Sequence, residues 1–131
     1  MRRGLVIGVF AVLAAGQAFA HHSGAMYDRS KLVTIKGVLK EYQFVAPHSW
    51  ISVIGSADGQ GGEPERWDVE GGSASRMAAQ GITPARLKVG DKVTIRCHPL
   101  RDGRHGGTLV DVVLEDGTLI TNDVTRLPVG Q

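Results

Sequence analysis

Residues 32–44, which read LVTIKGVLKEYQF, decide the fold that the sequence predicts. Val33 and Ile35 alternate with polar residues, as in a β-strand that buries one of its faces. Gly37 interrupts the alternation, which is expected at a β-bulge or at a sharp bend in a curved sheet. We therefore expect a long first strand that bends at Gly37.

The rest of the chain has the pattern of short strands separated by glycine-rich loops. Alternating apolar and polar residues predict strands at residues 48–54, 66–70, 92–98 and 108–115, and composition predicts loops at 55–64 and 101–107. The one convincing helix covers residues 74–80, with Ser73 as its N-cap and Gly81 at its C-terminal end. Asp116 and Gly117 then turn the chain into a C-terminal tail.

The order of these elements is three strands, a short helix and two strands, or β-β-β-α-β-β. Together with a glycine in a long first strand, this order predicts an all-β fold, a five-stranded OB-like barrel. A small open β-sandwich is the alternative.

The alternation also predicts which side chains face outward. Ile51 and Val53 share one face, and Trp67 and Val69 do the same in the next strand. The side chains expected on the outer face are His48, Trp50 and Ser52, followed by Arg66, Asp68 and Glu70. Cys97 shares its face with Val93 and Ile95, which predicts a small buried side chain rather than a reactive thiol.

The first twenty residues have the three parts of a signal peptide. Arg2 and Arg3 provide the positive start, residues 5–15 form a short apolar core, and Ala18-Phe19-Ala20 is a cleavage site. The rival interpretation is an uncleaved membrane anchor, but a membrane span needs about 20 apolar residues. We expect a signal peptide at 1–20, no transmembrane anchor after cleavage, and a periplasmic or secreted domain at 21–131. That domain has an extended N-terminal segment and a C-terminal tail.

Composition narrows the classes of function. Removing Arg2 and Arg3 leaves 13 of the 15 Lys and Arg residues against 13 Asp and Glu residues, so the formal net charge falls from +2 to 0. A neutral domain with no basic cluster is not expected to bind nucleic acid. Because Cys97 is the single cysteine, the domain cannot form an internal disulfide.

Cleavage would place His21 at the new N-terminus. An N-terminal histidine offers an α-amine and an imidazole nitrogen to one metal ion, and His22 can add a third nitrogen. Nitrogen donors of this kind suit Cu(II) and Zn(II). The alternative is a mobile chain end whose histidines bind nothing.

Three further histidines are candidate ligands. His48 lies in the second predicted strand, and His98 and His105 flank the glycine-rich loop before the last one. A histidine in such a loop is more often solvated than bound to a metal. Asp68 and Glu70 can accept a hydrogen bond from a ligating histidine, although surface carboxylates are the ordinary interpretation.

Trp50 supports a second kind of function. Its indole and the His48 imidazole are expected side by side on the outer face, where they can form a surface for a cell-envelope protein or glycan. The alternative is that Trp50 packs beneath the N-terminal segment or the C-terminal tail.

Several motifs together resemble a family of small exported bacterial proteins of unknown function whose mature chains begin His-His-Ser. The matching stretches are 21–23, 47–50, Trp67 with 70–72, 87–93 and 98–103. Family members often have a bulky residue where this chain has Gly24, and Asn where it has Ala46. The resemblance implies export and a single compact domain, and it implies no particular activity.

No nucleophile elbow, phosphate loop, dinucleotide fingerprint or CxxC pair is present in the sequence, so we expect a non-enzymatic role. The leading hypothesis is a periplasmic protein that binds Cu(II) or Zn(II) through His21 and His22, with His48 or His98 completing the site. A non-catalytic binding module around Trp50 is the alternative, and a copper-dependent oxidase is a third.

Overall fold

A computed structural model describes residues 23–58 and 60–121 of the chain. The elements are η1 (Ser23–Met26), β1 (Val33–Gln43), β2 (Trp50–Ala57), β3 (Glu65–Glu70), α1 (Ala74–Ala79), β4 (Lys92–Pro99), β5 (Gly106–Leu114) and β6 (Leu119–Thr121). Residues 1–20, predicted to be a signal peptide, lie outside the described residues, as do His21 and His22. No helix in the described part is long and apolar enough to cross a membrane.

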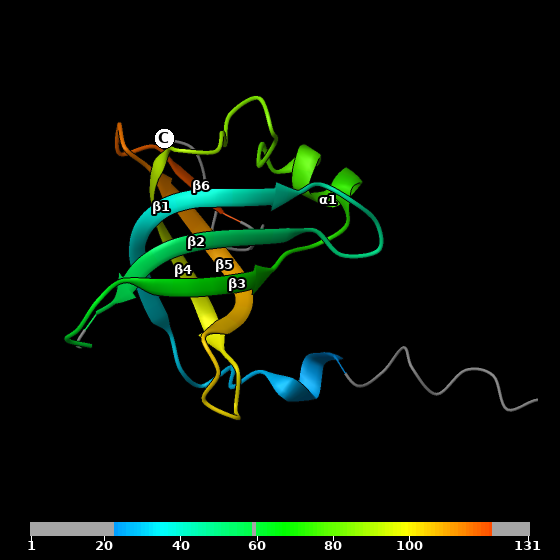
Figure 1. The fold of residues 1–131 in the computed structure, drawn as a ribbon. Coiled ribbons are helices and arrows are strands. Elements are labelled where there is room, and N and C mark those ends of the chain that lie inside the picture. Colours follow the sequence, from blue (N-terminus) through cyan, green and yellow to red (C-terminus); the bar gives the residue numbers. More distant parts are fainter. Residues whose placement is uncertain (1–22, 59, 122–131) are drawn as a thin grey trace, which may run out of the picture.

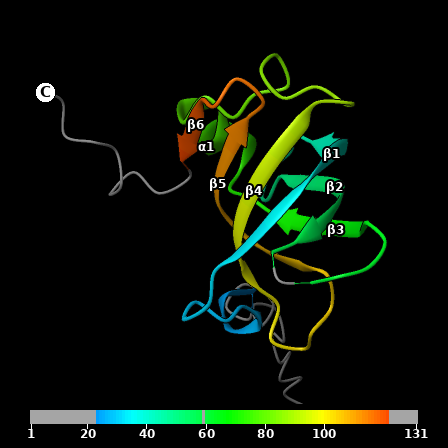
Figure 2. The same cartoon turned by 90° about the vertical axis from the view of Figure 1, so that its left-hand side faces the viewer.

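The strands form a closed barrel (Figures 1 and 2). The sheet runs β3-β2-β1-β4-β5-β6, and a parallel pairing between β3 and β5 closes it. The closing pairs are Asp68 with Gly106, Val69 with Gly107 and Glu70 with Thr108. The helix lies between β3 and β4 in sequence, so the prediction of a five-stranded OB-like barrel is confirmed.

The barrel interior is filled by the side chains that the alternation placed inward. Ile51, Val53, Trp67, Val69, Val93, Ile95 and Cys97 are all buried. Met77 of α1 is buried with them, so the helix covers one end of the core. Burial of these apolar side chains is the main term that stabilises the fold.

Of the two alternatives expected at Gly37, a β-bulge or a bend in a curved sheet, the structure does not have the β-bulge. Gly37 pairs regularly with Gly55, and the register shift in β1 falls between Leu39 and Glu41. A Cβ atom on Gly37 would lie 2.4 Å from the Ile54 carbonyl oxygen and 2.8 Å from the Gly55 Cα. The glycine is therefore needed because β1 and β2 approach closely where β1 curves.

Two predicted strands have other bounds in the structure. β2 begins at Trp50 rather than at His48 and continues to Ala57, through part of the predicted loop at 55–64, and β5 begins at Gly106, inside the predicted loop at 101–107. Gly55, Gly106 and Gly107 join these strands through backbone pairing, although a glycine contributes nothing to an alternating side-chain pattern. Within the tail, whose structure the sequence left open, residues 119–121 form β6 and pair with β5.

Candidate functional site

Glu70 is the centre of the best-defined polar cluster. It is the last residue of β3 and faces outward, yet only 8% of its surface is exposed. Its Oε2 accepts a hydrogen bond from the Tyr27 hydroxyl. Its Oε1 lies 2.9 Å from His48 Nδ1. One buried carboxylate thus holds a tyrosine and a histidine, one on each oxygen.

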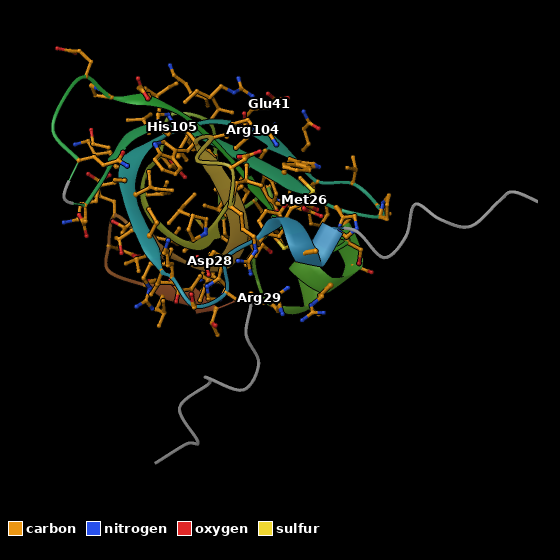
Figure 3. The ribbon with its side chains drawn as sticks, turned by 90° about the horizontal axis from the view of Figure 1, so that it is seen from below. Met26, Asp28, Arg29, Glu41, Arg104 and His105 are labelled. Carbon is orange, nitrogen blue, oxygen red and sulfur yellow. The ribbon has the colours of Figure 1, made fainter. Side chains whose placement is uncertain are left out.

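The backbone brings Tyr27 to this position. Tyr27 forms an isolated bridge with Leu100, just beyond β4. The Asp28 amide donates to the Pro99 carbonyl at 2.8 Å, and the Arg101 amide donates to the Met26 carbonyl at 2.9 Å. This N-terminal segment and the β4–β5 loop lie at the same end of the barrel, where Figure 3 labels Met26, Asp28, Arg104 and His105.

His48 is held by the residue that follows it. Ser49 is buried, its amide donates to the Gly72 carbonyl at 2.8 Å, and its own carbonyl accepts from the Gly71 amide at 2.8 Å. A Cβ on Gly71 would lie 2.7 Å from Met77 Cε, so this glycine lets the end of β3 pass against α1. The backbone on both sides of the His48–Glu70 contact is therefore fixed.

The chemistry of the cluster determines how His48 is presented. Burial, and then the hydrogen bond to Glu70, raise the pKa of Tyr27 well above its ordinary value, so its hydroxyl remains a donor. The 2.9 Å contact with Glu70 Oε1 occupies Nδ1 of His48 and leaves Nε2 for another partner. His48 Nε2 has no hydrogen-bond partner among the described residues, and the side chain is 49% exposed. A histidine held by a carboxylate in this way is the usual form of a metal ligand.

The other two described histidines point elsewhere. His98 Nδ1 lies 2.7 Å from the Lys31 carbonyl oxygen. His105 Nδ1 lies 2.5 Å from Glu65 Oε2, and its ring stacks on Trp67 with centroids 4.6 Å apart. No three His, Cys, Asp or Glu side chains within residues 23–58 and 60–121 are grouped so that they could hold a metal.

The structure partly agrees with the expectations for this site. Glu70 does contact a histidine, and its burial excludes the ordinary interpretation of a solvated surface carboxylate. Asp68 instead binds Arg66, with Nε 2.9 Å from Oδ1. Trp50 is 37% exposed on the outer face, as expected. The sequence did not predict a role for Tyr27 at this site. The one available signal was that a large aromatic residue stands four positions after His21-His22-Ser23.

Comparison with known proteins places the chain in a family. Residues 10–110, well over half of the 131, match the Family of unknown function (DUF6152). The chain belongs to this family. The matched region contains Tyr27, His48 and Glu70, so the whole cluster lies inside the DUF6152 domain. No curated protein and no solved structure matches the chain.

Proposed function

We propose that this DUF6152 protein is exported and binds Cu(II) or Zn(II) between a mature N-terminus at His21 and the imidazole of His48. The observation that supports the proposal most directly is that Tyr27 and His48 share the two oxygens of Glu70. His22 precedes Tyr27 by five residues, and Ser23–Met26 between them form the short helix η1, so the stretch is shorter than its fully extended reach of about 17 Å. The two N-terminal histidines therefore come a few residues before Tyr27, which is anchored beside His48 through Glu70.

His48 is a stronger ligand candidate than His98. Glu70 and His98 both pair with Thr108, on opposite sides of β5. Two strand spacings, about 9.6 Å, therefore separate the Glu70 and His98 backbones. Since Glu70 contacts His48 directly, His48 is the third histidine of the proposed site, and His98 is the reserve candidate.

The N-terminal amine is central to the proposal. If residues 1–20 are a signal peptide, cleavage after Ala20 leaves His21 with a free α-amine. The amine and the imidazoles must be unprotonated to bind a metal, so binding releases protons and depends on pH. Mass spectrometry of the exported protein tests the first step, with His21 expected as the first residue; retention of residues 1–20 would contradict it.

Calorimetric titration of Cu(II) and Zn(II) into the chain starting at His21 tests the site. We expect one metal ion per chain. One extra residue before His21 and the change His48→Ala should each weaken binding by at least tenfold, and Glu70→Gln by about tenfold. His105→Ala is the matched control, because His105 contacts Glu65 and Trp67 instead. Unchanged affinity in the extended chain would refute the amine chelate.

A further inference from the structure

The outer face of β1, β2 and β3 carries an exposed aromatic ring that the proposed metal site does not use. In Figure 1 these three strands lie side by side at the front, and no described helix or loop crosses them. Trp50 starts β2 on this face and is 37% exposed, whereas the inward-facing Trp67 is 4% exposed. The ring contacts among the described residues are Tyr42 with Phe44, edge to face, and Trp67 with His105, stacked, so none of them involves the Trp50 indole.

Polar side chains surround this indole in register. Trp50 pairs with Gln43 on one side and with Glu70 on the other. The next outward row along the strands is Glu41, Ser52 and Asp68. Ser52 and Glu70 are buried at 3% and 8% exposed, so the polar groups that a ligand can reach beside the exposed ring are Gln43, Glu41 and Asp68.

These polar groups are held in place by one another. Arg66 Nη2 donates to Ser52 Oγ at 2.8 Å and lies 3.3 Å from Glu41 Oε2, and Arg66 Nε lies 2.9 Å from Asp68 Oδ1. Gln43 Nε2 donates to Glu41 Oε1 at 2.7 Å. The side chains of Arg66, Glu41 and Asp68 remain about half exposed. A fixed but accessible array loses little conformational entropy when it binds a ligand.

The chemistry of the face selects one class of ligand. The paired rows contain three carboxylates, from Glu41, Asp68 and Glu70, and Arg66 is the nearby guanidinium, so phosphate backbones are repelled. Trp50 is the one large exposed hydrophobic residue within these three strands, so the face offers a single apolar ring rather than an extended apolar patch. A sugar ring, with an apolar C–H face and a rim of hydroxyl groups, matches both features.

We propose that this face binds an uncharged oligosaccharide. The Trp50 indole stacks on the C–H face of one sugar ring, and Arg66, Glu41 and Asp68 bind the hydroxyl groups of the next rings. The four-residue step from Glu70 to Arg66 covers about 13 Å along β3, enough for two or three rings. This role is independent of the metal site, although His48 is only two residues from Trp50.

Titration with β-linked tetrasaccharides of glucose and of N-acetylglucosamine tests the proposal. The chain has two tryptophans. Because Trp67 is buried, a change in fluorescence on binding reports Trp50. The titrations are done in EDTA so that metal binding cannot contribute. Backbone amide shifts in NMR should map to the outer rows of β1, β2 and β3.

Trp50→Ala should weaken binding at least tenfold, Trp50→Phe should retain most of it, and Arg66→Lys should lose several-fold because the planar fork is lost. Val89→Ala is the control, since Val89 is 68% exposed in the turn before β4. A dissociation constant weaker than about 1 mM for both tetrasaccharides, or equal binding by Trp50→Ala, would overturn the proposal. Metal binding by Trp50→Ala is expected to be unchanged, so a failure of the oligosaccharide proposal can be told apart from a failure of the metal site.

Discussion

At the scale of single residues, the buried thiol of Cys97 has a defined chemical behaviour. Cys97 lies in β4 with its side chain in the core, and burial raises the pKa of the thiol to about 12 from an ordinary value of 9.0. The thiolate fraction at neutral pH is therefore about a thousandfold lower than that of a free cysteine. We expect iodoacetamide to leave Cys97 unmodified in the folded protein and to modify it fully in concentrated guanidinium.

The same shift predicts a pH dependence with a definite sign. The thiol loses its proton less readily when folded, so its contribution to stability is complete below pH 9 and is lost as the pH rises toward 12. Tyr42, whose pKa burial raises to about 12, acts in the same direction above pH 10. Melting temperatures should fall through this range, and less steeply in Cys97→Ala. Rapid alkylation of the folded protein would contradict both expectations.

At the scale of elements, the close approach of β1 and β2 explains the glycine pair. Gly37→Ala would force a Cβ against the Ile54 carbonyl, where the 2.4 Å separation leaves no room. Because both neighbours are backbone, the strands must shift, and we expect a loss of about 2–3 kcal/mol in urea unfolding. Gly61→Ala is the control, since nothing lies within 4 Å of its added Cβ. Equal stability of the two variants would show that the strands separate at little cost.

At the scale of the whole molecule, the Tyr27–Glu70 hydrogen bond joins the N-terminal segment to the barrel. Tyr27→Phe removes the donor and leaves a buried carboxylate oxygen unpaired. We expect amide exchange at Asp28 and Arg101 to accelerate roughly five- to tenfold, equivalent to about 1–1.4 kcal/mol of local stability. Exchange at Val53 and Ile95, in the core strands, should be unchanged.

Tyr42→Phe is the matched control for this experiment. Its hydroxyl also donates a hydrogen bond, at 2.6 Å, but to the Ile82 carbonyl on a different part of the barrel. Tyr42→Phe should leave amide hydrogen exchange at Asp28 and Arg101 unaffected. If Tyr27→Phe behaves in the same way, the segment is held by its backbone bonds alone, and the support that Glu70 gives to the metal site weakens.

Local patterns were sufficient to predict most of the elements. Val93, Ile95 and Cys97 alternate with polar neighbours, and Ser73 and Gly81 bracket α1 as a cap and a stop. The outward positions of Trp50 and Glu70 follow from the same two-residue period, whereas His48 lies before the start of β2. Gly106 and Gly107 could not be assigned to β5 in this way, because they carry no side chain and are placed in the sheet by backbone pairing, both with β3 and Gly107 also with Pro99 of β4.

The sequence by itself therefore determined the order of strands and helix, the inward and outward faces, and the outer-face residues that carry the candidate chemistry. Only the tertiary structure decided that the bend at Gly37 is a close approach to Gly55, that β3 and β5 close the barrel, and that Tyr27 shares Glu70 with His48. The physical reason is the separation in sequence over which each interaction acts. Alternation and capping act between residues a few positions apart, whereas 43 positions separate Tyr27 from Glu70, and only the folded backbone brings them together.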